Sequence, residues 1–181
     1  MGKRFSAQMY LYFLPLDDDT TPPPSHDGGI EHTEALFDIV PAWIQKASRG
    51  DVVMYEPQAY LINVVGQFLD GKSDDYQAQR DALRQFATSP PTGPNGAPSR
   101  GPASHIAWSE KVMCPYVARA DSTGRAVLSI ESPGPDLAES GRGGDYDRVV
   151  IVRSWDSMPR EVEVKWRKDV LKVEGQETPK L

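Results

Sequence analysis

The sequence predicts an α+β fold, with a mainly antiparallel sheet, about three helices packed on one side, and long loops rich in Gly and Pro. Apolar residues recur at helical spacing in the first half of the chain and alternate in the second half. The 15 glycines and 16 prolines gather between these stretches. We expect a single domain over 1–181, with a helix-rich region over 1–88, a loop over 89–104, a strand-rich region over 105–174 and a tail over 175–181.

The first half is expected to contain two strands and three helical regions. Residues 5–16 form the first expected strand, because Ala7, Met9, Leu11 and Phe13 alternate with Ser6, Gln8, Tyr10 and Tyr12. The second expected strand is Asp51–Glu56. Helices are expected over 31–49 in two pieces, over 57–69 and over 74–88. The β-branched residues of 57–69 also allow a strand, but Pro57 at the start and Gly71 beyond the end favour a helix.

The low-complexity loop 89–104 is expected to stay outside the core. The second half then reads as an antiparallel meander. The expected strands are 112–120, 126–131, 148–155, 161–166 and 170–173, which gives a sheet of roughly five to seven strands.

The composition restricts the class of protein. A single cysteine excludes an internal disulfide and suits a reducing compartment. We find no signal-peptide pattern and no apolar run long enough for a membrane helix, so a cytoplasmic or intracellular protein without membrane contact is expected. The net charge is −6. Residues 1–90 carry 7 basic and 13 acidic side chains, and residues 91–181 carry 13 of each. An acidic chain is a poor general binder of nucleic acid.

One candidate metal site lies in the loop 17–29. Asp17, Asp19 and His26 offer oxygen and imidazole ligands that a divalent cation could use. Their spacing matches no known metal loop, and the other interpretation is a solvated acidic loop. The sequence itself predicts no cofactor.

Two further motifs are weak. Cys114 and His105 could form a nucleophile and its base, but Cys114 lies in an expected strand, where packing as a small apolar residue is the simpler interpretation. The glycine run 141–144 lacks the residues and the strand-to-helix context of a phosphate-binding loop. We expect it to be a flexible loop.

The strand-rich half offers a candidate partner-binding surface. It combines tryptophans with basic side chains, namely Trp155, Trp166, Arg153 and Arg167. Such residues are enriched at interfaces, although exposed polar alternation and core packing explain them equally well.

The sequence lacks the concentrated His, Cys, Ser and acidic constellations that enzymes need. The leading hypothesis is therefore a non-catalytic interaction or assembly protein, of the kind found among viral, phage or mobile-element structural and accessory proteins. It would bind a protein partner or a second copy of itself. A metal-dependent hydrolase using Asp17, Asp19 and His26 is one alternative. An acidic immunity or inhibitor protein for a basic partner is another.

Overall fold

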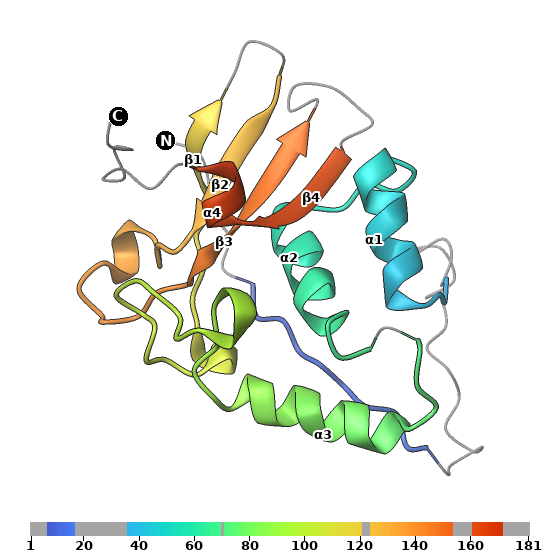
Figure 1. Ribbon diagram of the computed structural model, residues 1–181. Helices are drawn as coiled ribbons and strands as arrows, with labels where there is room; N and C mark the ends of the chain where they lie inside the picture. The colour runs from blue at the N-terminus through green and yellow to red at the C-terminus, as the bar shows by residue number, and fades with distance from the viewer. Residues whose placement is uncertain (1–6, 17–35, 70, 121–123, 154–160, 172–181) are drawn as a thin grey trace, which may run out of the picture. The chain divides into compact units, whose positions relative to one another are not determined.

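The computed structural model describes residues 7–16, 36–69, 71–120, 124–153 and 161–171. These residues form an α+β fold built on an antiparallel sheet, as the sequence predicts (Figure 1). The chain divides into two units, 1–37 and 38–181.

All regular elements of the described chain belong to the second unit. In chain order they are α1 (Val40–Arg49), α2 (Glu56–Val65), α3 (Tyr76–Ala87), η1 (Pro94–Gly96), η2 (Trp108–Glu110), β1 (Tyr116–Ala120), β2 (Ala126–Ile130), η3 (Pro135–Leu137), β3 (Asp145–Arg153), β4 (Glu161–Trp166) and α4 (Arg167–Val170). In the first unit, 7–16 is an irregular chain without strand pairing.

The helix boundaries follow from local signals. Proline stands in the first turn of α1 and of α2, where its missing N–H costs no hydrogen bond. Gly50 ends α1 with a φ of 74°, a left-handed conformation that glycine adopts without strain. The carboxylate of Asp75 caps α3 by accepting a hydrogen bond from the Ala78 amide at 2.9 Å.

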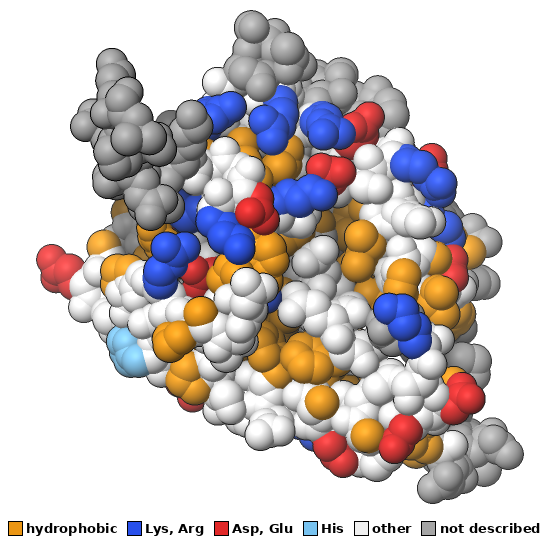
Figure 2. Space-filling view, in the orientation of Figure 1, with side chains coloured by type: hydrophobic (Ala, Val, Ile, Leu, Met, Phe, Trp, Pro, Cys, Tyr) orange, Lys and Arg blue, Asp and Glu red, His pale blue; other side chains and the backbone are white. Residues whose placement is uncertain are grey.

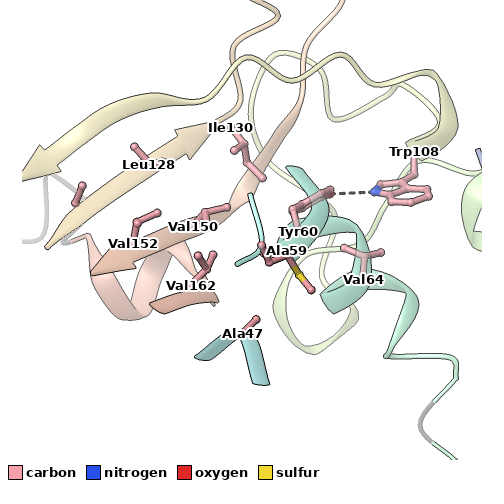
Figure 3. Packing of buried hydrophobic residues seen from close by; sticks show 12 residues of the cluster. Ala47, Ala59, Tyr60, Val64, Trp108, Leu128, Ile130, Val150, Val152 and Val162 are labelled. Carbon is pink, nitrogen blue, oxygen red and sulfur yellow. Dashed lines mark hydrogen bonds between the residues drawn. The ribbon is translucent and has the colours of Figure 1, made fainter. Parts of the chain in front are cut away.

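The four described strands pair in sequence order, β1-β2-β3-β4. One face of the sheet carries the main apolar core, where strand residues meet α1, α2 and the η2 turn (Figure 3). The strand residues of this face include Leu128, Val150 and Val162, which are at most 3 % exposed. The opposite face holds Val127, Val149 and Ile151, and Val170 and Leu171 pack against them from α4 and its end.

Three expected strands are not formed in the described residues. Residues 7–16 pair with no other strand. Of the stretch Asp51–Glu56, residues 51–55 connect α1 to α2, Glu56 begins α2, and Met54 is buried in the core. The expected strand 170–173 is wrong at its start, because Arg167–Val170 form α4 and place Val170 on the sheet. Of the first expected helical piece, residues 36–39 are irregular.

The Gly/Pro-rich loop 89–104 and the glycine run 141–144 are both more ordered than expected. In the loop 89–104, Pro91 and Ala103 are buried, and the buried carboxylate of Asp147 accepts hydrogen bonds from the Ser99 hydroxyl at 2.8 Å and the Arg100 amide at 3.0 Å. The expectation that this loop stays outside the core is therefore wrong. In the run 141–144, Gly144 is buried and donates its amide to the Glu131 carbonyl at 2.8 Å. A Cβ at Gly144 would collide with the Ile130 carbonyl oxygen.

A buried polar network joins the helices to the sheet. The Asp145 carboxylate, at the start of β3, accepts hydrogen bonds from the Tyr60 hydroxyl and from the Arg148 guanidinium, both at 2.8 Å. The Tyr60 hydroxyl accepts in turn from the Trp108 indole at 2.9 Å (Figure 3). The Arg148 guanidinium also lies 4.2 Å from the ring centre of Trp166. We call Asp145, Arg148, Tyr60 and Trp108 the Asp145 network.

Replacing Asp145 tests how much the Asp145 network contributes to the stability of the fold. Asp145→Asn leaves the Arg148 guanidinium, which is 4 % exposed, without its charge partner. Removing one member of a buried pair costs about 3–5 kcal/mol, so the free energy of unfolding in denaturant should fall by that amount. The exposed control Glu139→Gln should change it by less than about 0.5 kcal/mol. If the free energy of unfolding of Asp145→Asn fell only by the small amount expected for the loss of an exposed ion pair, the structural role of the network would be contradicted.

The pH dependence of stability gives a second test. Burial, followed by the neighbouring Asp145 charge, raises the pKa of Tyr60 well above its ordinary value of 10.0. The unfolded chain then releases this proton first, so the stability that protonated Tyr60 provides is lost as the pH rises above about 10. The stability of the wild type relative to Tyr60→Phe should fall by up to about 1.4 kcal/mol per pH unit in that range. A difference that stays constant with pH, measured by denaturant unfolding, would contradict the assignment.

Candidate functional site

A groove lies where α1, α2 and β4 meet. Its volume is about 210 Å³, and it is open to solvent on one side. The lining residues are Ile44, Ala47 and Ser48 from α1, Met54 from the connection, Ala59, Ile62 and Asn63 from α2, and Val162, Glu163, Val164 and Lys165 from β4. We call this the β4 groove.

The size of the lining side chains explains why the groove exists. Ala47, Ser48 and Ala59 are small and stand where the two helices approach β4. Figure 3 places Ala47, Ala59 and Val162 around the same region. The helices meet closely elsewhere, because a Cβ on Gly66 would come within 2.8 Å of Val40 Cγ1. The space is therefore left at one end of the α1–α2 contact.

The groove borders the edge of the sheet. Successive side chains of a strand point to opposite faces, yet four consecutive residues of β4, 162–165, line this one cavity. The cavity must therefore meet β4 along its backbone edge. Within the described sheet, β4 pairs only with β3, so its other edge has no strand partner there, and α1 packs against β4 at the groove. Unpaired backbone groups beside an apolar hollow can accept an added strand.

The rim of the groove carries charges of both signs. Glu163 lies 3.7 Å from the Arg153 guanidinium, which also pairs with Glu161 at 3.2 Å. Lys165 is exposed, and no ion pair joins it to another residue of the described chain. Figure 2 shows Lys and Arg side chains gathered over the strand end of the molecule, with Asp and Glu side chains interspersed among them.

The predicted partner-binding residues occupy different places. Trp166 is half-buried at the end of β4, on the helix-covered face, under the Arg148 guanidinium. Arg153 lies opposite Glu161, at the other end of the β3–β4 hairpin, roughly 17 Å along the strand. Arg167 is mostly buried and pairs with Glu131 at 3.0 Å. Trp155 lies outside the described residues, and the structure places the three described side chains, Trp166, Arg153 and Arg167, against different partners.

The predicted metal ligands Asp17, Asp19 and His26 also lie outside the described residues, and the metal site stays a prediction. No group of three or more His, Cys, Asp or Glu side chains in the described ranges is arranged to hold a metal ion. Among the same residues, no helix has the length and apolar character needed to cross a membrane.

Cys114 is half-buried and packs beside Gly134, whose Cβ position lies 3.2 Å from the cysteine sulfur. Its amide donates to the Ser132 carbonyl at 2.7 Å. His105 is exposed in the loop before η2. The packing interpretation of Cys114 accounts for these contacts without chemistry.

Sequence reasoning missed the β4 groove and the Asp145 network. The groove depends on small side chains from two helices and one strand, and no local pattern marks Ala47 and Ala59 as neighbours of Val162. One feature of the sequence could have indicated the Asp145 network. It is the unusual run Asp145-Tyr146-Asp147-Arg148 at the start of an otherwise apolar strand. Charged residues in such a position are buried only when paired.

Comparison of the chain with protein-family models, with curated proteins and with solved structures finds no match. The groove and the surface around it are therefore the basis for a functional proposal.

Proposed function

We propose that this protein is a non-catalytic interaction module that binds an extended segment of a protein in the β4 groove. The observation that carries the proposal is a hollow, lined mainly by apolar residues, beside the edge of β4 that has no strand partner in the described sheet. Main-chain hydrogen bonds to a strand edge supply affinity, and a side-chain pocket beside the edge supplies specificity.

The dimensions of the groove support an apolar anchor. A cavity of roughly 150 Å³ lined by apolar side chains is known to hold benzene. The β4 groove, at about 210 Å³, has room for one leucine or phenylalanine side chain. Small-molecule and cofactor sites are larger, about 300–1,000 Å³. The groove therefore suits a side chain of a protein partner better than a nucleotide or a flavin.

The polar side chains elsewhere support a binding role over a catalytic one. The buried carboxylates of Asp145 and Asp147 are each engaged by a guanidinium and by other donors. The half-buried Lys111 ammonium donates to the carbonyls of Ala103 at 2.6 Å and Gly144 at 3.1 Å. These groups hold segments of the fold together, which is a structural task.

A selection experiment tests the proposal. Random linear peptides displayed on phage are selected on the full-length chain, and the selected peptides are measured by titration. We expect sequences with an apolar residue flanked by residues of extended propensity. Ser48→Trp places an indole in the groove and should weaken these peptides by at least about tenfold, which is 1.4 kcal/mol.

Ser109→Trp makes the same substitution at an exposed residue of η2 outside the groove, and it should leave peptide affinity unchanged. Melting curves of both variants check that the fold is kept. If selection returns no binders, or if Ser48→Trp binds them as tightly as the wild type, the proposed function is wrong.

A further inference from the structure

Two oppositely charged side chains border the hollow of the β4 groove. Glu163 and Lys165 both line it, and Val164 lies between them in β4. Lys165 is exposed, and the side chain of Glu163 is 26 % exposed. Both charges therefore lie within reach of a segment that occupies the groove.

The pairing of β4 with β3 shows to which face of the sheet each side chain points. Val164 lies opposite Val150, a residue of the main core under the helices. Glu163 and Lys165 lie opposite residues of the second apolar cluster, on the face that α4 covers. Directly opposite residues of a ladder share a face. Val164 therefore points to the side of α1 and α2, and the two charged side chains point together to the other side.

A strand that adds to the edge of β4 continues this alternation. Its residue opposite Val164 points toward the hollow, where Ala47 and Ala59 leave space. The residues before and after it lie beside Glu163 and Lys165 on the other face. Opposite charges in directly opposite positions stabilise a pair of strands, and like charges destabilise it. The added strand should therefore carry a cation beside Glu163 and an anion beside Lys165.

The described surroundings leave these two charges only partly compensated. The Arg153 guanidinium lies 3.7 Å from Glu163 and 3.2 Å from Glu161, so one cation serves two carboxylates. No ion pair within the described part of the chain involves Lys165. On the same face, α4 exposes one basic and one acidic side chain, which add no net charge. Each of the two positions can therefore gain from an opposite charge on the bound segment.

We propose that the segment bound in the β4 groove runs antiparallel to β4 and reads acidic, apolar, basic from its N-terminus to its C-terminus. The acidic residue lies beside Lys165, the apolar residue enters the hollow, and the basic residue lies beside Glu163. The antiparallel direction is favoured because every strand pair of the described sheet is antiparallel, and such pairs are slightly more stable per residue. This inference rests on the proposed function and names the chemistry of its partner.

Two peptides of the same composition test the order of the charges. One contains Glu-Leu-Lys and the other Lys-Leu-Glu, each between the same Thr-Val-Thr flanks with blocked termini, and both are titrated on the full-length chain. The first should bind at least about fivefold more tightly, because it gains two opposite-charge pairs where the second meets two like charges. The ratio of the two affinities should fall toward one as salt is raised.

Exchanging the two charges of the protein gives the matched result. Glu163→Lys combined with Lys165→Glu keeps the net charge and should reverse the preference, so that Lys-Leu-Glu binds more tightly. Asp81→Lys combined with Arg84→Glu makes the same exchange in an exposed ion pair of α3, outside the groove, and should keep the wild-type preference.

Melting curves check that each variant is folded. If the exchange in the groove does not fold, Lys165→Glu alone replaces it, since this change affects only an exposed side chain. Two carboxylates then border the hollow, and a Lys-Leu-Lys peptide in the same flanks should bind more tightly than Glu-Leu-Lys. A variant that keeps the wild-type preference would show that Lys165 does not read the acidic position.

The outcomes separate this inference from the proposed function. Equal binding of the two peptides to the wild type overturns the role of the two charges, while the groove still binds an extended segment. Tighter binding of Lys-Leu-Glu to the wild type overturns the antiparallel direction. If neither peptide binds, the phage-selected peptides decide. Selected peptides without the acidic, apolar, basic order sink the inference alone, and a selection without binders sinks the proposed function with it.

Discussion

The carboxylate of Asp145 is the point at which α2 and the sheet are joined, and the Tyr60 hydroxyl that it holds extends the link to Trp108 of η2. It is 1 % exposed, and it accepts hydrogen bonds from a tyrosine of α2, from an arginine of its own strand and from the amides of Asp147 and Arg148. A charge so far from water is tolerated only when its bonding capacity is used. The network therefore allows one arrangement of α2 on the sheet, and an arrangement that separated Tyr60 from Asp145 would leave buried polar groups unpaired.

The groove is a consequence of that arrangement. Tyr60 is held at its hydroxyl, and the neighbouring Ala59 with Ile62 and Asn63 then borders β4 on the same helix. The ring of Trp108, whose indole donates to Tyr60, lies 5.4 Å from the ring of Phe86 and ties α3 to the same core. The partners of the network thus fix the walls of the groove from inside. Ser48 and Asn63 line the groove without belonging to the core cluster, so substitutions at these two positions change the groove with the least change to the core.

Sequence reasoning recovered the fold class, α1, α2, α3 and the β2–β3–β4 meander, because those elements carry strong local signals such as the first-turn prolines, Gly50 and the alternation of Val162 and Val164. It overestimated the number of strands. The segment 7–16 has a strand pattern but no pairing partner among the described strands, and Val170 packs on the sheet as part of a helical turn. The groove was not predictable, because it arises from the absence of side-chain volume at Ala47, Ser48 and Ala59, and spacing along the chain cannot show which small residues meet in space.

The most direct test of the groove is amide hydrogen exchange in β4, followed residue by residue by NMR, with and without a saturating peptide selected on the full-length chain. In an antiparallel pair, alternate amides of β4 face β3 and the others face the groove. A peptide that adds to the edge of β4 should slow exchange at those alternate, groove-facing amides and leave β1, the other edge of the described sheet, unchanged. Protection that appears in β1, or none in β4 despite binding, would contradict strand addition at the groove.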